Sequence, residues 1–160
     1  MEEKPHLKTA LTKAMQICSR QEYCISDIEK KLEQWEVSKP DMYEITDILQ
    51  KENFINEERY ATAFAKDKFN YNKWGKIKIA SHMKIKKIPM TIIDMALDSI
   101  DSSRYITTLE TIIKTHRKSV KAKNSYELKA KLMRFGLSRG FESSLLYELL
   151  GNIDDDGMLP

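Results

Sequence analysis

The sequence predicts an all-α protein of three tandem three-helix repeats that form an elongated, curved array. Apolar residues recur every three or four positions, the spacing of amphipathic helices, and no segment alternates with a period of two. A similar spacing returns roughly every fifty residues, as in repeat proteins. The 160 residues include only 5 Gly and 4 Pro, which argues against a turn-rich β-sandwich and against a glycine-rich nucleotide loop.

Nine helical faces follow one another and divide the chain into repeats at residues 1–54, 55–102 and 103–151. The first repeat has faces at 7–18, 28–35 and 42–49, the second at 60–69, 79–83 and 93–100, and the third at 105–116, 128–135 and 145–150. Residues 152–160 contain Asp154, Asp155 and Asp156, and we expect a flexible acidic tail there.

Helix start signals support this division. Ser26-Asp27-Ile28-Glu29 has the form of a capping box. Asn56 precedes two acids and Asn124 precedes Glu127 by three positions, which predicts an N-terminal cap at each asparagine. Pro40 and Pro89 are expected in first helical turns.

The repeat is clearest in the middle helix of each trio. Trp35 and Phe135 stand three residues after their anchors, whereas Lys86 takes that position in the second repeat. Either the second-repeat helix ends sooner or Lys86 lies at a functional opening. The three anchors, separated by 51 and 49 residues, are Leu32, Met83 and Leu132.

Charge is unevenly distributed, although the formal net charge is only +3. Residues 1–59 carry 9 basic and 13 acidic side chains, residues 60–93 carry 8 and 1, and residues 111–141 carry 9 and 1. A basic stripe attracts phosphate backbones or an acidic protein groove, although a solvated lysine-rich helix face is the plainer alternative.

Patterns that would indicate catalysis or metal binding are not found in the sequence. The three histidines are far apart, and His116 lies on an apolar helix face, which predicts a partly buried structural role. Cys18 and Cys24 form no CxxC motif. We therefore predict no enzyme activity, no cofactor and no metal. The N-terminus has no secretory signal and no apolar run suits a membrane span, so we expect a cytoplasmic protein without membrane contact.

The loop Asn70-Tyr71-Asn72-Lys73-Trp74-Gly75-Lys76-Ile77-Lys78 mixes aromatic and cationic residues between two helices. Such residues stack on bases or enter a partner's groove, while lysines meet phosphates or carboxylates. Trp74 is thus either a binding anchor or a cap on the core. Lys78 and Lys84 face away from Ile79 and Met83, and a helix-turn-helix is also compatible with this segment.

Three motifs resemble those of the RecX family of recombination regulators. They are Phe54-Ile55-Asn56-Glu57-Glu58-Arg59-Tyr60-Ala61, the Lys-Trp-Gly-Lys turn with its basic helix up to Lys86-Lys87-Ile88-Pro89, and Arg139-Gly140-Phe141-Glu142. Asn53 stands where the family usually has glycine, and asparagine also adopts left-handed backbone conformations. Glu57 stands where aspartate is common, and Asn56 is able to cap in its place.

The resemblance implies three tandem three-helix repeats and a protein that binds the RecA recombinase filament on DNA. It implies modulation, chiefly inhibition, of ATPase activity, filament growth and strand exchange, in DNA recombination, repair and the SOS response. Alternatives are a stand-alone helix-turn-helix DNA-binding protein and a helical adaptor for another protein. We expect a monomer that binds single-stranded or double-stranded DNA only weakly.

The predicted partner-binding or DNA-binding residues are cations, with Trp74 as the one aromatic anchor. Only the motif positions among them are supported by the resemblance, and the others rest on charge. They are Lys73, Trp74, Lys76, Lys78, Lys84, Lys86, Lys87, Arg117, Lys118, Lys121, Lys123 and Arg139.

Overall fold

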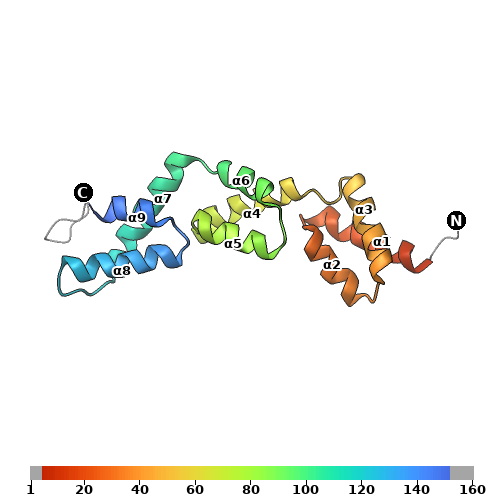
Figure 1. The fold of residues 1–160 in the computed structure, drawn as a ribbon, viewed down its shortest axis with the longest axis horizontal. Helices are drawn as coiled ribbons and strands as arrows, with labels where there is room; N and C mark the ends of the chain where they lie inside the picture. Colours follow the sequence, from red (N-terminus) through yellow and green to blue (C-terminus); the bar gives the residue numbers. More distant parts are fainter. Residues whose placement is uncertain (1–4, 152–160) are drawn as a thin grey trace. The chain divides into compact units, whose positions relative to one another are not determined.

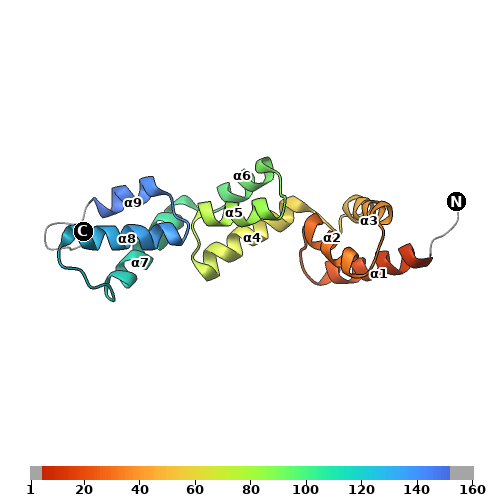
Figure 2. The ribbon, with the colours of Figure 1, turned by 60° about the horizontal axis from the view of Figure 1, so that its bottom comes forward.

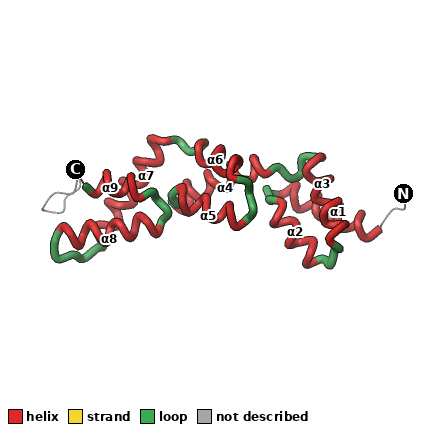
Figure 3. The backbone as a smooth tube through the Cα atoms, viewed as in Figure 1, coloured by secondary structure: helices red, strands yellow, loops and turns green. Residues whose placement is uncertain are grey.

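The computed structural model describes residues 5–151, and this part of the chain contains nine α-helices and no β-strand (Figure 1 and Figure 3). The predicted all-α class is confirmed. The expected acidic tail lies outside the described residues. The helices are α1 (Pro5–Arg20), α2 (Ile25–Gln34), α3 (Lys39–Lys51), α4 (Glu57–Asn72), α5 (Lys76–Ile85), α6 (Met90–Asp98), α7 (Ser102–Arg117), α8 (Ser125–Ser138) and α9 (Ser143–Leu150).

Two of the predicted helix starts are confirmed by side-chain caps. The Asn56 side-chain oxygen accepts the backbone N–H of Arg59 at 3.0 Å at the start of α4. The Asn124 side-chain oxygen accepts the N–H of Glu127 at 2.8 Å at the start of α8. Each bond satisfies a first-turn N–H group that has no partner within its own helix.

The predicted start of α2 and the predicted place of Pro89 need correction, whereas the prediction for Pro40 is confirmed. Helix α2 begins at Ile25, so Ser26 lies inside it, and the capping residue is Cys24. The acid that reaches back is Asp27, which accepts the Cys24 N–H at 3.5 Å. Pro40 lies in the first turn of α3 as predicted, whereas Pro89 immediately precedes α6 and its carbonyl accepts the Ile93 N–H at 3.0 Å.

Five helices end with a residue in the left-handed backbone conformation. Asn53, expected to replace glycine in this role, has φ of 61° just after α3. The conformation turns the chain while the last N–H groups close onto helix carbonyls, as when Phe54 N–H donates to Leu49 O at 2.8 Å. Within residues 5–151, the residues with this conformation are Glu36, Asn53, Lys73, Lys87 and Gly140.

The chain forms two compact units. The first unit comprises Met1–Ala63 with Met83–Ala96, and the second comprises Phe64–His82 with Leu97–Pro160. The boundary passes through α4, α5 and the last turn of α6, so these three helices contribute residues to both units. No helix in the described ranges is long and apolar enough to cross a membrane.

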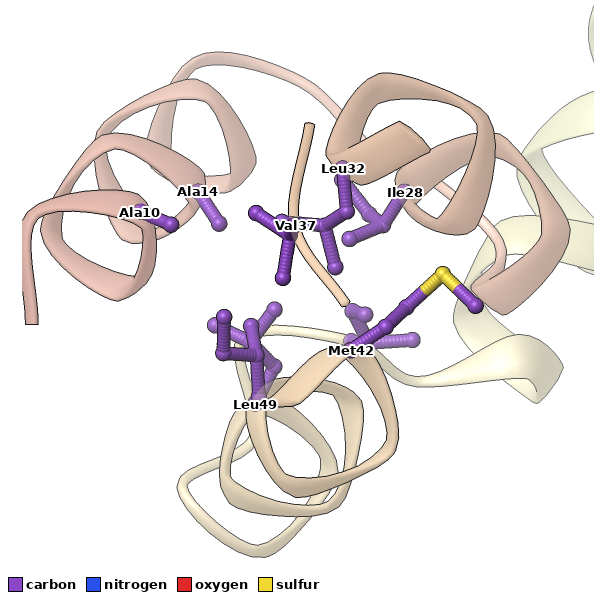
Figure 4. Packing of buried hydrophobic residues seen from close by; sticks show 9 residues of the cluster. Ala10, Ala14, Ile28, Leu32, Val37, Met42 and Leu49 are labelled. Carbon is purple, nitrogen blue, oxygen red and sulfur yellow. The ribbon is translucent and has the colours of Figure 1, made fainter. Parts of the chain in front are cut away.

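The core of the first unit lies between α1, α2 and α3, and Figure 4 shows its side chains converging. Ile28, Leu32 and Leu49 are completely buried. Ala10 and Ala14 supply the small surface of α1 that faces them. Burial of such aliphatic side chains contributes roughly 1.5–3 kcal/mol each, so this cluster holds the three helices together.

In the second unit, α8 packs against both α7 and α9 (Figure 1 and Figure 2). Leu132 and Leu146 are completely buried. Gly136 makes the close approach of α9 to α8 feasible, because a Cβ atom there would lie 2.3 Å from a methyl carbon of Leu146. This packing fixes the turn between α8 and α9, which belongs to the candidate site.

Candidate partner-binding surface

The turn before α5 and the turn before α9 are joined by backbone hydrogen bonds within the second unit. Gly75 N–H donates to Arg139 O at 2.7 Å, and Ile77 N–H donates to Gly140 O at 3.0 Å. A Cβ atom on Gly75 would lie 2.3 Å from the carbonyl carbon of Gly140. Two motifs 65 residues apart in the sequence therefore form one junction, and each needs its glycine for close backbone contact.

Tyr105 of α7 completes this junction. Its hydroxyl accepts the Lys76 N–H at 2.9 Å and donates to a carboxylate oxygen of Glu142. Its ring packs against Phe141 and Phe69, with centroids 5.1 and 5.6 Å away. Burial, and then the bond to Glu142, raise the pKa of Tyr105 above its ordinary value, so the phenol keeps its proton.

The junction occupies the first N–H groups of α5. The N–H group of Gly75 is bonded to Arg139 and that of Ile77 to Gly140, each through a carbonyl oxygen. The N–H group of Lys76 is bonded to the Tyr105 hydroxyl. At an open helix N-terminus such N–H groups are available to a phosphate. A helix-turn-helix protein presents the N-terminal part of its second helix to the bases. The occupied N–H groups are therefore not available to a phosphate, but they do not bear on base contacts, which a helix-turn-helix makes with its side chains.

Trp74 lies half-buried beside the junction, surrounded by cationic side chains. The ammonium groups of Lys78 and Lys68 lie 4.7 and 5.0 Å from its ring centroid, and the His82 ring centroid lies 4.5 Å away. Cations held against an indole face gain about 0.5–1 kcal/mol each when partly exposed. Lys68 was not among the predicted residues, although its position six residues before Trp74 lies within the same basic stretch.

We call Lys73, Trp74, Lys76, Lys78 and Arg139 the Trp74 surface, because the second unit brings these five predicted residues together. The Lys73 ammonium donates to Asn70 O at 2.6 Å, and that of Lys76 lies 5.0 Å from the Tyr105 ring centroid. The Arg139 guanidinium lies 5.2 Å from the Phe135 ring centroid. These contacts hold the carbon stems while the charges remain near the surface.

A second group of predicted cations lies elsewhere in the same unit. Arg117 ends α7, and the other three residues occupy the connection to α8. Arg139 follows the opposite end of this 14-residue helix, so α8 separates the two groups by roughly 20 Å at 1.5 Å per residue. The structure does not join this group to the Trp74 surface. Its members are Arg117, Lys118, Lys121 and Lys123.

The third group, Lys84, Lys86 and Lys87, lies in the first unit. Lys86 forms an ion pair with Asp27 of α2, and its side chain is 33% exposed. The hydrogen bond to Asp27 is the main cause that raises the pKa of Lys86. Lys86 breaks the aromatic pattern of the repeat because it follows the end of α5 and pairs with Asp27 of α2 instead of entering a core.

The first RecX-like motif, residues 54–61, contacts the α1–α2 connection and the first residue of α2. Arg59 pairs with Glu22, and Glu57 accepts the Ile25 N–H at 3.3 Å. Desolvation is the largest cause that raises the pKa of Glu57, and the carboxylates of Asp27 and Glu29 add to it. This motif therefore has a structural role in the first unit, holding the start of α2.

The described residues hold no group of three or more side chains suited to a metal ion. Burial is the main cause that raises the pKa of both Cys18 and Cys24, which disfavours the reactive thiolate. The His116 ring stacks on Phe135 with centroids 3.7 Å apart, in the structural role predicted for it. The chemistry that this surface offers is binding through cations and Trp74.

Family models match two parts of the chain. The second three-helix domain of RecX matches residues 56–97, and the third matches residues 107–150, which together make up more than half of the 160 residues. Two solved structures share the fold. A crystal structure of regulatory protein RecX superposes with a TM-score of 0.83 at 21% identity, over 92% of this chain and 73% of the other. The crystal structure of RecX from Lactobacillus salivarius superposes with a TM-score of 0.80 at 19% sequence identity. The match covers 92% of this chain and 96% of the Lactobacillus chain.

Curated relatives carry the name regulatory protein RecX. The Clostridium acetobutylicum protein is 30% identical over 131 residues, which cover 79% of this chain and 60% of the relative. The Lactococcus lactis protein is 30% identical, and the match covers 75% of this chain and 46% of the relative. The Actinobacillus pleuropneumoniae protein is 27% identical, and the match covers 83% of this chain and 85% of the relative. The chain thus spans about half the length of the first two relatives. With its three-helix domains and matching folds, the chain belongs to the RecX family of regulatory proteins.

Proposed function

We propose that this protein binds the RecA recombinase filament on DNA and modulates it, chiefly by inhibiting its ATPase, filament growth and strand exchange. Membership of the RecX family is the observation that supports this proposal most strongly, because the resemblance of this chain to RecX regulators implies RecA as the target. The role needs binding and no covalent chemistry, which agrees with a surface of cations around one indole ring.

The Trp74 surface is our first candidate for contact with the filament. It is supported by the ordered junction beneath it, because a preorganised side chain loses less freedom on binding than a mobile one. The cations around the α7–α8 connection and Lys84, Lys86 and Lys87 remain predicted contacts. We propose that weak binding to single-stranded or double-stranded DNA uses the same basic residues.

We further propose a cytoplasmic monomer whose repeats occupy residues 1–54, 55–102 and 103–151. The two family-model matches lie within the second and third of these ranges, which supports the division. The paired Lys86 and Asp27, one from each of the first two proposed repeats, would then form a link between them.

The proposal is tested by titrating this protein into an ATPase reaction that contains the cognate RecA and single-stranded DNA. We expect the rate to fall at well below one molecule per RecA, because a filament responds cooperatively to a bound modulator. Lys78→Glu should weaken inhibition, whereas Lys30→Glu, at an exposed position in α2, should not. An unchanged ATPase rate at equimolar protein and low salt would overturn the proposal.

A further inference from the structure

Helix α5 carries aliphatic side chains on two opposite faces. Ile79 and Met83 are completely buried, whereas Ile77 is 54% exposed and Ile85 is 71% exposed. At about 100° per residue, Ile77, Ser81 and Ile85 follow one line along the side opposite Ile79 and Met83. A surface helix ordinarily presents polar side chains to water, so the two exposed isoleucines make this side of α5 more apolar than is usual for a solvent-facing helix side.

Cationic side chains border this line. Lys84 is exposed and adjoins Ile85, and Lys78 lies at the edge, with its ammonium over Trp74. Neither lysine forms an ion pair with another described residue. The surrounding stretch, residues 60–93, has 8 basic residues and 1 acidic residue. We call Ile77, Ser81, Lys84 and Ile85 the outer face of α5.

The composition of this face favours a protein over a nucleic acid as its occupant. Isoleucine has no π-face for stacking on a base, which is how single-stranded nucleic acid is ordinarily held. The N–H groups at the start of α5, which suit a phosphate, are already occupied by Arg139, Gly140 and Tyr105. The isoleucines would be stabilised by burial against an apolar surface of a partner, and the lysines would be stabilised by pairing with its carboxylates.

We propose that the outer face of α5 docks into an apolar groove edged by carboxylates on a protein partner. Ile77 and Ile85 enter the groove, and Lys84 pairs with its acidic edge, in the manner of helix-in-groove recognition. This inference rests on the proposed function and takes the RecA filament as that partner. It adds two anchors that charge and motif arguments overlook, because an exposed isoleucine looks like a core residue in the sequence.

The test compares the wild-type protein, the double variant Ile77→Ser/Ile85→Ser and the control Met95→Ser in the RecA ATPase titration. Met95 is 43% exposed on α6, so the control removes a comparable exposed apolar side chain from another helix. The double variant should need about tenfold more protein for half-maximal inhibition, the scale of losing two interface anchors. The control should stay within about twofold. Thermal unfolding verifies that all three proteins are folded.

A second variant keeps the test decisive if the double variant does not fold. Ser81→Trp places a large ring at the centre of the exposed line without touching the core, and it should weaken inhibition to a similar degree. Binding of each protein to a labelled oligothymidylate without RecA is measured alongside and should not change. Loss of that binding in the double variant would assign the face to nucleic acid and overturn protein docking.

The two proposals fail in distinguishable ways. If the wild-type protein inhibits RecA and both the double variant and Ser81→Trp inhibit it equally well, the docking face is wrong while the proposed function stands. If the wild-type protein leaves RecA unaffected, both are overturned.

Discussion

Tyr105 joins two helix ends through a single hydroxyl group, which accepts from Lys76 N–H and donates to Glu142. Tyr105→Phe keeps the ring contacts but leaves the Lys76 N–H without its acceptor. We expect the free energy of unfolding to fall by about 1–3 kcal/mol, as for other orphaned buried polar groups. Urea denaturation measures this change. Tyr126→Phe is the control, because the Tyr126 side chain is 83% exposed, and an equal loss in both variants would contradict the role of the junction.

Glu57 gives a pH-dependent prediction. Desolvation raises its pKa above the ordinary value of 4.5, so the folded protein holds this proton at pH values where the unfolded chain has lost it. The contribution of Glu57 to stability therefore falls as pH rises from below 4.5 through the folded-state pKa. Glu57→Gln removes the charge but still offers an oxygen to the Ile25 N–H.

We expect Glu57→Gln to exceed the wild type in free energy of unfolding at pH 7, and the difference to vanish as pH falls below 4.5. Denaturation series across this range provide the measurement. Glu58→Gln controls for the lost charge in the first turn of α4. A Glu57→Gln protein that is less stable than Glu58→Gln at pH 7 would show that the charged carboxylate is favoured instead.

Among elements, the helices and most of their ends follow from local patterns. Asn56 and Asn124 are predictable caps because the bond each makes spans three residues, and Asn53 is a predictable left-handed terminator. The sequence predicts the start of α2 two residues late, because serine is a preferred N-cap residue and cysteine is not. Two hydrogen bonds fix the earlier start instead. Asp27 accepts the Cys24 N–H, and Glu57 accepts the Ile25 N–H from 32 residues away in the sequence.

Asp27 and Lys86 link two elements of the first unit, and a double-mutant cycle measures the link. Asp27→Asn and Lys86→Gln should each reduce the free energy of unfolding by roughly 1–3 kcal/mol, between the values for exposed and buried pairs. The double variant should lose less than the sum, because each single variant leaves one partner unpaired. Additive losses would mean that the two side chains do not interact in solution.

At the scale of the whole molecule, the sequence identified the class of fold and the basic stretches, but not how the cations are grouped. The RecX-like motifs at 73–76 and 139–142 carried no sign that they contact each other, since that junction depends on backbone bonds between distant turns. Charge counts alone also do not distinguish among the eleven predicted cations. The structure assigns the predicted residues to the Trp74 surface and the α7–α8 group of the second unit, and to three lysines of the first unit that include the paired Lys86.

The most direct test of our central claim is a binding measurement with fluorescently labelled protein. It compares preassembled RecA filaments on single-stranded DNA with the same DNA alone. We predict clearly tighter binding to the filament, with an affinity reduced by Lys78→Glu and by Ile77→Ser/Ile85→Ser. Equal affinity for the bare DNA and for the filament would contradict the assignment of RecA as the target.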